Sequence, residues 1–296
     1  MLRFRSFLSS SLAVLLLCAA ACSRPAPVAT GGIAVVDDAG DTTRLAAPAG
    51  RVVSLIPATT ELLFAIGAGN AVVGRTTWCD YPAEARAVPD LGDGIAPNIE
   101  AVLGQRPDLV LLYPSGRNAA AAERLRSMGI ATVQLRTDLL ADVTRVGALL
   151  GRLTGREREA AALKARFESA LAQATVKQPA TVPSVFLLVW AEPPMTVGAG
   201  SYLSELLQRG GGRNAYDDLP TSSGQVSIES VVARHPDAIL VLGDSTPAFA
   251  TRPEWQAVAA VRERRFVFAS GSQFAHPGPR APDAIRALAR SLVALP

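Results

Sequence analysis

Histidine and cysteine are scarce in this sequence, and their scarcity excludes several kinds of site. The 296 residues contain two histidines, His235 and His276, and three cysteines, Cys18, Cys22 and Cys79. A protein zinc site usually takes three or four imidazole, thiolate or carboxylate ligands, more than this sequence offers as a group. Because Cys18 and Cys22 fall in or beside the leader described below, only Cys79 belongs to the body of the protein. We therefore predict neither a metal site nor an internal disulfide.

Signatures of catalysis and of nucleic-acid binding are also missing. The sequence has no G-x-S-x-G elbow, no phosphate-binding loop and no H-E-x-x-H motif. The formal net charge of +3 falls to +1 when a leader with two arginines and no acidic residue is removed. No basic run interleaved with aromatic residues accompanies this small charge, so we expect no nucleic-acid partner.

The first 21 residues have the pattern of an export signal. Arg3 and Arg5 precede an apolar stretch, residues 7–17, that is too short for a membrane-spanning helix. Three alanines and Cys22 follow, as in a bacterial lipobox, although Ala19 stands where leucine is usual. We predict cleavage after residue 21, a lipid on Cys22 and a protein held on a membrane in the periplasm or at the cell surface. The alternative is an ordinary signal peptide in which Cys22 has no role.

The rest of the chain predicts a soluble α/β protein. Residues 22–50 indicate a Pro- and Gly-rich tether and then a β-hairpin, with strands at 33–36 and 42–45. Alternating segments then predict helices and largely parallel sheets. The strand-like segments are 52–56, 109–113, 131–135, 185–190, 238–242 and 266–269. The helix-like segments are 57–67, 99–105, 119–128, 138–174 with an interruption at Thr154-Gly155, 202–208, 228–234, 254–261 and 282–292.

One helix–Pro-Asp–strand unit occurs twice. Ile99, Glu100, Pro107 and Asp108 recur as Ile228, Glu229, Pro236 and Asp237, all at one offset of 129 residues. Four identities in register indicate two related lobes. Two facing lobes enclose a cleft, and clefts between domains are preferred ligand sites.

Several motifs resemble one family. Residues 51–62 (RVVSLIPATTEL) and 73–82 (VGRTTWCDYP) are followed by Pro-Pro-Met-Thr at 193–196, Gly-Gly-Arg-Asn at 211–214, Gln-Val-Ser at 225–227 and Gly-Pro-Arg at 278–280. Together they resemble the periplasmic binding proteins of vitamin B12, siderophore and haem importers, over residues 50–292. The Cys-Asp-Tyr-Pro ending favours the vitamin B12 branch.

The resemblance implies a fold and a function. It implies two α/β lobes, at 51–137 and 179–296, joined by a single long bridging helix within 138–178, with a rather rigid cleft between them. It implies a monomer that captures a corrinoid, such as cobalamin, without chemistry and delivers it to an ABC permease that has two transmembrane subunits and an ATPase.

Ligand contacts are implied from both lobes. Trp78 matches a ligand-contacting aromatic position, where a ring face would pack on the flat corrin. The second contacting loop comprises Ser272, Gln273, Phe274, Ala275 and His276. Tyr113, Trp190 and Met195 lie at or after predicted strand ends and either line the cleft or belong to the core. This chain departs from the pattern at Gly94 and Ser223, where related B12 proteins often carry tryptophan.

The repeated glutamates have two interpretations. Glu100 and Glu229 each begin a predicted helix, where a carboxylate favours the positive end of the helix dipole. In the resembling family, such glutamates, one per lobe, meet arginines on the two permease subunits.

Two other hypotheses remain open: the second is capture of haem or of a ferric siderophore, and the third is an enzyme. Haem would want an axial tyrosine or histidine, and Tyr113, Tyr202, Tyr216 and His276 are available. An anionic siderophore would want an arginine cluster in the cleft. An enzyme on a two-lobed α/β scaffold is the third hypothesis, disfavoured by the missing nucleophile–base motifs.

Lipidation is testable directly. We predict that the mature chain begins at Cys22 with diacylglycerol attached, so that Cys22→Ser releases the protein from membranes. Mass spectrometry of the membrane-extracted protein checks this. A mature chain that starts elsewhere and carries no lipid would contradict the prediction.

Overall fold

The computed structural model describes residues 32–295, and the residues from Ile33 onward form one compact unit. The signal peptide, Cys22 and most of the tether lie outside the described residues. The predicted hairpin is confirmed: β1 (Ile33–Val36) pairs antiparallel with β2 (Thr42–Leu45). Its turn is closed by Asp37, whose Oδ1 accepts hydrogen bonds from the backbone N–H groups of Ala39 and Asp41.

The N-terminal lobe is a four-stranded parallel sheet covered by helices. Its strands lie in the order β4 (Val72–Arg75), β3 (Val52–Ser54), β5 (Leu109–Leu112) and β6 (Ala131–Gln134). The helices are α1 (Pro57–Ala65), α2 (Ile99–Gly104) and α3 (Gly116–Ser127). Every residue of β5 is buried, as expected for a central strand with both faces covered.

The C-terminal lobe repeats this plan. Its parallel sheet has the order β10 (Arg213–Asn214), β7 (Ser184–Leu188), β12 (Ala238–Val241) and β13 (Phe266–Phe268). A small antiparallel sheet adds β11 (Ser223–Gln225), β9 (Pro194–Val197) and β8 (Trp190–Ala191). The helices are α6 (Tyr202–Arg209), α7 (Ile228–Arg234), α8 (Ala259–Arg262) and α9 (Ala281–Val293). The fold class predicted from the sequence, two α/β lobes with parallel sheets, is confirmed.

The sequence repeat is also a repeat of geometry. Arg106 and His235, which precede the two Pro-Asp pairs, both have left-handed backbones, with φ of 47° and 45°. Asp108 then accepts hydrogen bonds from the N–H groups of Gly50 (2.9 Å) and Arg51 (3.1 Å), just before β3. Asp237 likewise accepts from the N–H of Ser184 (2.8 Å), the first residue of β7. Each repeated aspartate therefore fastens the start of the neighbouring strand.

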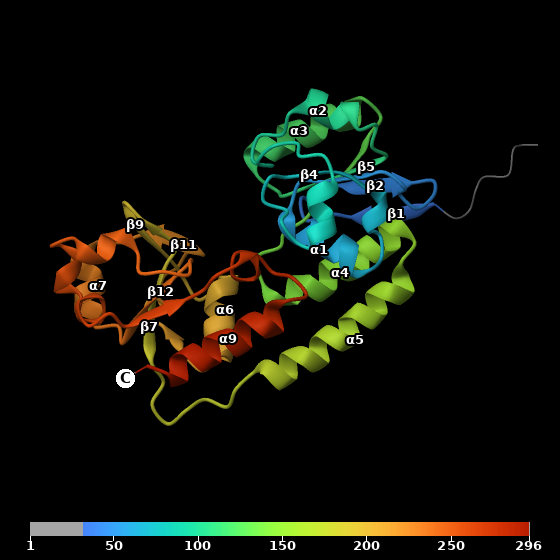
Figure 1. Ribbon diagram of the computed structural model, residues 1–296. Coiled ribbons are helices and arrows are strands. Elements are labelled where there is room, and N and C mark those ends of the chain that lie inside the picture. The colour runs from blue at the N-terminus through green and yellow to red at the C-terminus, as the bar shows by residue number, and fades with distance from the viewer. Residues whose placement is uncertain (1–31, 296) are drawn as a thin grey trace, which may run out of the picture. The chain divides into compact units, whose positions relative to one another are not determined.

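The bridging segment differs from the prediction of one long helix. It forms two helices, α4 (Leu140–Thr154) and α5 (Glu157–Ala174), which lie side by side in Figure 1. Gly155 ends α4 in a left-handed conformation, with φ of 66°, and so reverses the chain. The reversal lets α4 pack on α1 of the N-terminal lobe while α5 runs along α9 of the C-terminal lobe.

One predicted helix is wrong. Residues 254–261 form a single 3₁₀ turn at Trp255–Ala257 and then the short α8. Trp255 is fully buried and packs on Phe249, with ring centroids 4.4 Å apart, so tertiary packing overrides the local pattern. No helix in residues 32–295 combines the length and the apolar character needed to cross a membrane.

Candidate ligand-binding cleft

A cavity of about 720 Å³ lies between the two lobes. Its walls come from loops that follow the carboxyl ends of strands in both sheets, the usual place for ligands in open parallel α/β sheets. The N-terminal lobe contributes Ile56, Pro57, Thr77, Trp78 and Asp80, and the segment before α4 contributes Thr137. The C-terminal lobe contributes Leu242, Gly243, Ala269, Gly271, Ser272, Ala275 and His276.

Trp78 is held outward by the loop that follows β4. The next residue, Cys79, is buried, with its sulfur 3.1 Å from the Thr60 hydroxyl and 3.2 Å from the Thr76 hydroxyl. Backbone hydrogen bonds from Cys79 N–H to Thr76 and from Asp80 N–H to Trp78 tighten the turn. With Cys79 fixed inward, the neighbouring indole is left 63% exposed at the cavity wall.

The predicted second loop is divided between cavity and core. Ser272, Ala275 and His276 line the cavity, as predicted for a contacting loop. Phe274 does not: it is 4% exposed and belongs to the hydrophobic core. The half-buried amide of Gln273 accepts from Arg280 (2.9 Å) and donates to the Ser270 carbonyl (2.9 Å). Neither Phe274 nor Gln273 is therefore among the residues that line the cavity.

His276 presents a neutral imidazole to the cleft. Burial lowers the pKa of His276, against the opposing negative charges of Glu61 and Asp80. Its Nδ1 is buried and has no hydrogen-bond partner among the described residues. Since Nδ1 is closed off, the part of the ring that lines the cavity is what a ligand would contact.

Beside the cavity, an ion pair connects the two lobes. Arg280 donates from Nε and Nη2 to the two carboxylate oxygens of Glu61 on α1, at 2.9 and 2.8 Å. The Glu61 side chain is 2% exposed and that of Arg280 19%. Arg280 also donates to Ser272 (2.9 Å) and lies over the ring of Tyr81, 3.9 Å from its centroid. One guanidinium thus fixes the Ser272–His276 loop against the opposite lobe.

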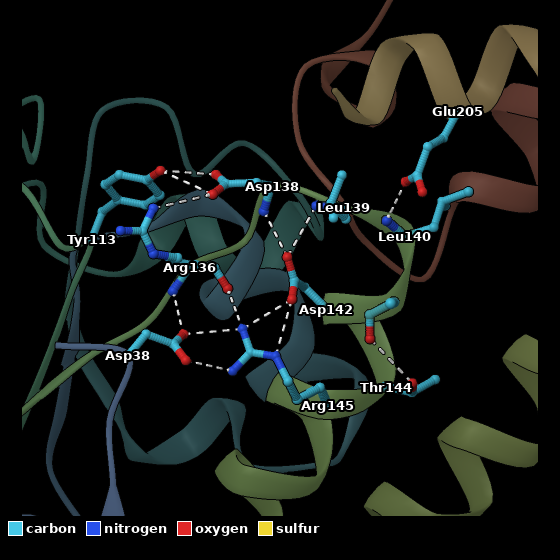
Figure 2. A network of polar contacts seen from close by, with 11 residues as sticks. Asp38, Tyr113, Arg136, Asp138, Leu139, Leu140, Asp142, Thr144, Arg145 and Glu205 are labelled. Atoms are coloured by element: carbon cyan, nitrogen blue, oxygen red, sulfur yellow. Dashed lines mark hydrogen bonds and ion pairs between the residues drawn. The ribbon is translucent and has the colours of Figure 1, made fainter. Parts of the chain in front are cut away.

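Tyr113 is engaged away from the cavity. Its hydroxyl donates to Asp138 (2.9 Å), and Figure 2 shows this pair within a network around the start of α4. In that network Asp142 accepts from the N–H groups of Asp138 and Leu139. Burial and the carboxylate of Asp138 raise the pKa of Tyr113, which disfavours the phenolate that binds haem iron. Tyr113 is therefore not among the residues that line the cleft.

A separate hydrogen bond ties the start of the bridging helix α4 to the C-terminal lobe. Glu205 of α6 accepts a hydrogen bond from the N–H of Leu140 (2.7 Å), the first residue of α4 (Figure 2). Thr137, which lines the cavity, lies three residues before Leu140, so this contact is made close to the cavity wall.

Trp190 and Met195 lie in the small antiparallel sheet, where they are paired across β8 and β9. Trp190 is 62% exposed, and its indole N–H donates to the Glu192 carbonyl (2.7 Å). It lines a second cavity of about 530 Å³ that shares Leu242 with the cleft. Met195 is half-buried and lines neither cavity.

Gly94 and Ser223, the two positions where related B12 proteins often carry tryptophan, differ in whether a large side chain would fit. Gly94 is buried with φ of +77°, and a Cβ there would lie 2.7 Å from the Leu55 carbonyl oxygen. A tryptophan at residue 94 would therefore require a different loop. Ser223 is exposed on β11, where nothing comparable restricts the side chain.

Sequence reasoning missed several lining residues. Asp80, Thr137 and Leu242 line the cleft, and Glu61 with Arg280 secures it. Glu61, Asp80 and Arg280 all lie inside the motifs quoted above. Glu61 and Arg280, however, are 219 residues apart, and no local pattern signals their pairing.

The charge of the lining is distinctive. Asp80 is the one acidic side chain that lines the cleft, and no lysine or arginine is among the lining residues described above. Residues 32–295 also contain no cluster of three or more histidine, cysteine, aspartate or glutamate side chains suited to a metal. The arginine cluster expected for an anionic siderophore is thus not found in the cavity wall.

Glu100 and Glu229 occupy matching exposed positions in the first turns of α2 and α7. The caps of the two helices come from other residues, Asn98 and Ser227, which accept from the N–H groups of Ala101 and Ser230. Hydrogen bonds from its own backbone N–H and from Ser227 lower the pKa of Glu229, so it is ionised at neutral pH.

Comparison with known proteins agrees with this architecture. A model of the periplasmic binding protein family matches residues 52–271. The chain is 30% identical to an uncharacterised ABC transporter substrate-binding lipoprotein of Bacillus subtilis, over 82% of this chain and 79% of that protein.

Solved structures share the fold. The periplasmic vitamin B12-binding protein of Vibrio cholerae is 26% identical, with a TM-score of 0.67 over 83% of this chain and 97% of that one. An apo haem-binding protein from Roseiflexus sp. RS-1 is 23% identical, with a TM-score of 0.73 over 82% of this chain and 98% of that one, a likeness of fold alone.

The chain belongs to the periplasmic binding protein family, whose members bind substrates and are not enzymes. Within it, the chain is a substrate-binding protein of an ABC importer, of the class that handles vitamin B12, haem and siderophores.

The ion pair between the lobes makes the first structural prediction. Arg280→Met should lower the free energy of unfolding by about 3–5 kcal/mol, because it leaves the Glu61 carboxylate buried without a partner. The double change Glu61→Leu with Arg280→Met should lower it by less than the two single changes combined, since no charge is then left uncompensated. Urea denaturation measures all three variants.

Arg286→Met is the matched control. Arg286 pairs with Asp283 on the exposed face of α9, where an ion pair contributes about 1 kcal/mol or less. If Arg280→Met lowers the free energy of unfolding no more than Arg286→Met does, the buried pair does not hold the lobes together.

Proposed function

We propose that this protein captures a corrinoid such as vitamin B12 in the cleft between its lobes and delivers it to an ABC permease. The observation that carries the proposal is the lining: an exposed tryptophan beside apolar and hydrogen-bonding groups, without a basic side chain. A corrin ring offers a flat face for the indole, and its peripheral amides offer hydrogen bonds. The Vibrio cholerae relative that binds vitamin B12 supports the same choice.

Haem is the second candidate, because the unpartnered His276 imidazole could serve as an axial ligand. The lining favours a corrinoid instead. Haem carries two propionates, which need cationic or hydrogen-bonding partners, and Asp80 would repel them. The tyrosine candidates are also engaged: Tyr202 donates to the Gln273 carbonyl (2.8 Å) and Tyr216 to Ser230 (2.9 Å).

Anchoring and docking complete the proposal. A lipid on Cys22 would hold the protein, acting as a monomer, near the membrane that contains the permease. Glu100 and Glu229, one on each lobe and both exposed, would meet cationic groups on the two permease subunits. Exposed charges of this kind mainly set the encounter rate and the register of a complex.

Ligand capture is predicted to depend on Trp78. Trp78→Ala should weaken cobalamin binding by about 1–3 kcal/mol, the usual loss for a buried aromatic anchor. Titration calorimetry with one ligand expected per chain measures the effect. Met128→Ala, which changes an exposed apolar side chain that does not line the cavity, should leave the affinity unchanged. Equal affinity of the wild type and Trp78→Ala for cobalamin would show that the indole does not contact the ligand.

Docking is predicted to depend on the paired glutamates. Glu100→Ala and Glu229→Ala should each leave ligand affinity intact and slow uptake, with the double change slower than either, because each lobe loses one anchor. Uptake of labelled cobalamin by cells carrying the permease measures this. Glu123→Ala, an exposed glutamate on α3, is the control. If the double mutant folds, binds the ligand and supports uptake at the wild-type rate, the two glutamates serve only to stabilise the starts of their helices.

A further inference from the structure

Asp80 combines three features in the cleft. It lines the cavity, it is the one acidic residue to do so in residues 32–295, and neither of its carboxylate oxygens has a hydrogen-bond partner among the described residues, Oδ1 being buried. A buried carboxylate oxygen without a partner carries a cost in free energy, and native proteins rarely leave it so. Because Oδ1 is closed off from the cavity, Oδ2 is the acceptor that a donor on the ligand would reach.

The guanidinium of Arg280 is not available as a hydrogen-bond partner for the Asp80 carboxylate. The negative charge of Asp80 contributes to raising the pKa of Arg280, although hydrogen bonding to Glu61 contributes more. The N–H groups of Arg280, however, are directed to Glu61, Gln273 and Ser272. Glu61 takes two of these bonds and is itself almost fully buried. The guanidinium is thus committed to fixing the lobes, and the carboxylate of Asp80 is left to the cavity.

The backbone around Asp80 is rigid. Its N–H donates to the Trp78 carbonyl at 3.0 Å, and its carbonyl accepts from the Arg86 side chain at 3.0 Å. The buried Cys79 fixes the preceding residue. The loop that directs the Trp78 ring into the cleft therefore also positions the carboxylate, so a ligand stacked on the indole lies beside an acceptor.

We infer that Asp80 determines ligand specificity: it accepts hydrogen bonds from N–H groups at the rim of the ligand and excludes ligands whose rim carries carboxylates. This inference rests on the proposed function and deepens it. A primary amide offers the N–H donor that a carboxylate accepts, and a hydrogen bond to a charged acceptor is among the stronger kinds. A carboxylate at the same place meets like charge and offers no donor.

Two corrinoid probes separate these cases. Cobinamide carries primary amides around the ring, whereas cobyrinic acid carries carboxylates there. The wild type should bind cobinamide more tightly than cobyrinic acid. Asp80→Asn keeps the size of the side chain and removes its charge, and it should lower that preference about 10- to 100-fold, the range expected when a hydrogen bond to a charged group is lost. Fluorescence titration of both probes gives the ratio.

Asp244→Asn is the matched control, because Asp244 is exposed on the loop that follows Leu242 and Gly243 but does not line the cavity. The ratio of its affinities for cobinamide and cobyrinic acid should equal the ratio in the wild type. An unchanged ratio in Asp80→Asn, or an equal loss for both probes, would overturn the inference while leaving the corrinoid function standing. A wild type that binds neither probe but binds haem would overturn the proposed function itself.

Discussion

The Glu61–Arg280 pair is the interaction on which the cleft depends. It joins α1 of the first lobe to the loop before α9 of the second, and the same guanidinium holds Ser272, Gln273 and the ring of Tyr81. Removing one member of this buried pair would leave the other charge uncompensated, so the packing of the two lobes at this point depends on both residues. Gly278 allows the close approach, since a Cβ there would lie 2.9 Å from a Glu61 carboxylate oxygen.

This tie and the Glu205–Leu140 hydrogen bond fix the cleft at two places. Both involve segments that continue directly into the cavity wall. A preformed cleft lowers the entropy lost on binding, because few side chains and no whole lobe must be ordered. Such a site suits a large rigid ligand better than a small one that must be enclosed by lobe closure.

The sequence predicted the lobes well because their signals are local. Buried strands such as β5 and β12 are short apolar runs after a repeated Pro-Asp, and the aspartates have matching roles in both lobes. The bridging segment was misjudged because the left-handed Gly155 converts an interruption into a reversal. Residues 254–261 were misjudged because burial of Trp255 decides their conformation.

The site was predicted less completely. The motif around Trp78 identified one wall, since the loop after β4 directs the indole outward. Phe274, in contrast, turns into the core, and a loop aromatic carries no local sign of which way it faces. Asp80 and the Glu61–Arg280 pair depend on contacts between distant segments, which only the folded chain brings together.

A direct competition between two ligands tests whether this protein binds a corrinoid in preference to haem. The mature protein, mixed with equimolar cobalamin and haem and then freed of unbound ligand by desalting, has an absorbance spectrum that identifies the retained ligand. The account predicts the corrin spectrum at about one equivalent per chain. Retention of haem in place of cobalamin would contradict it.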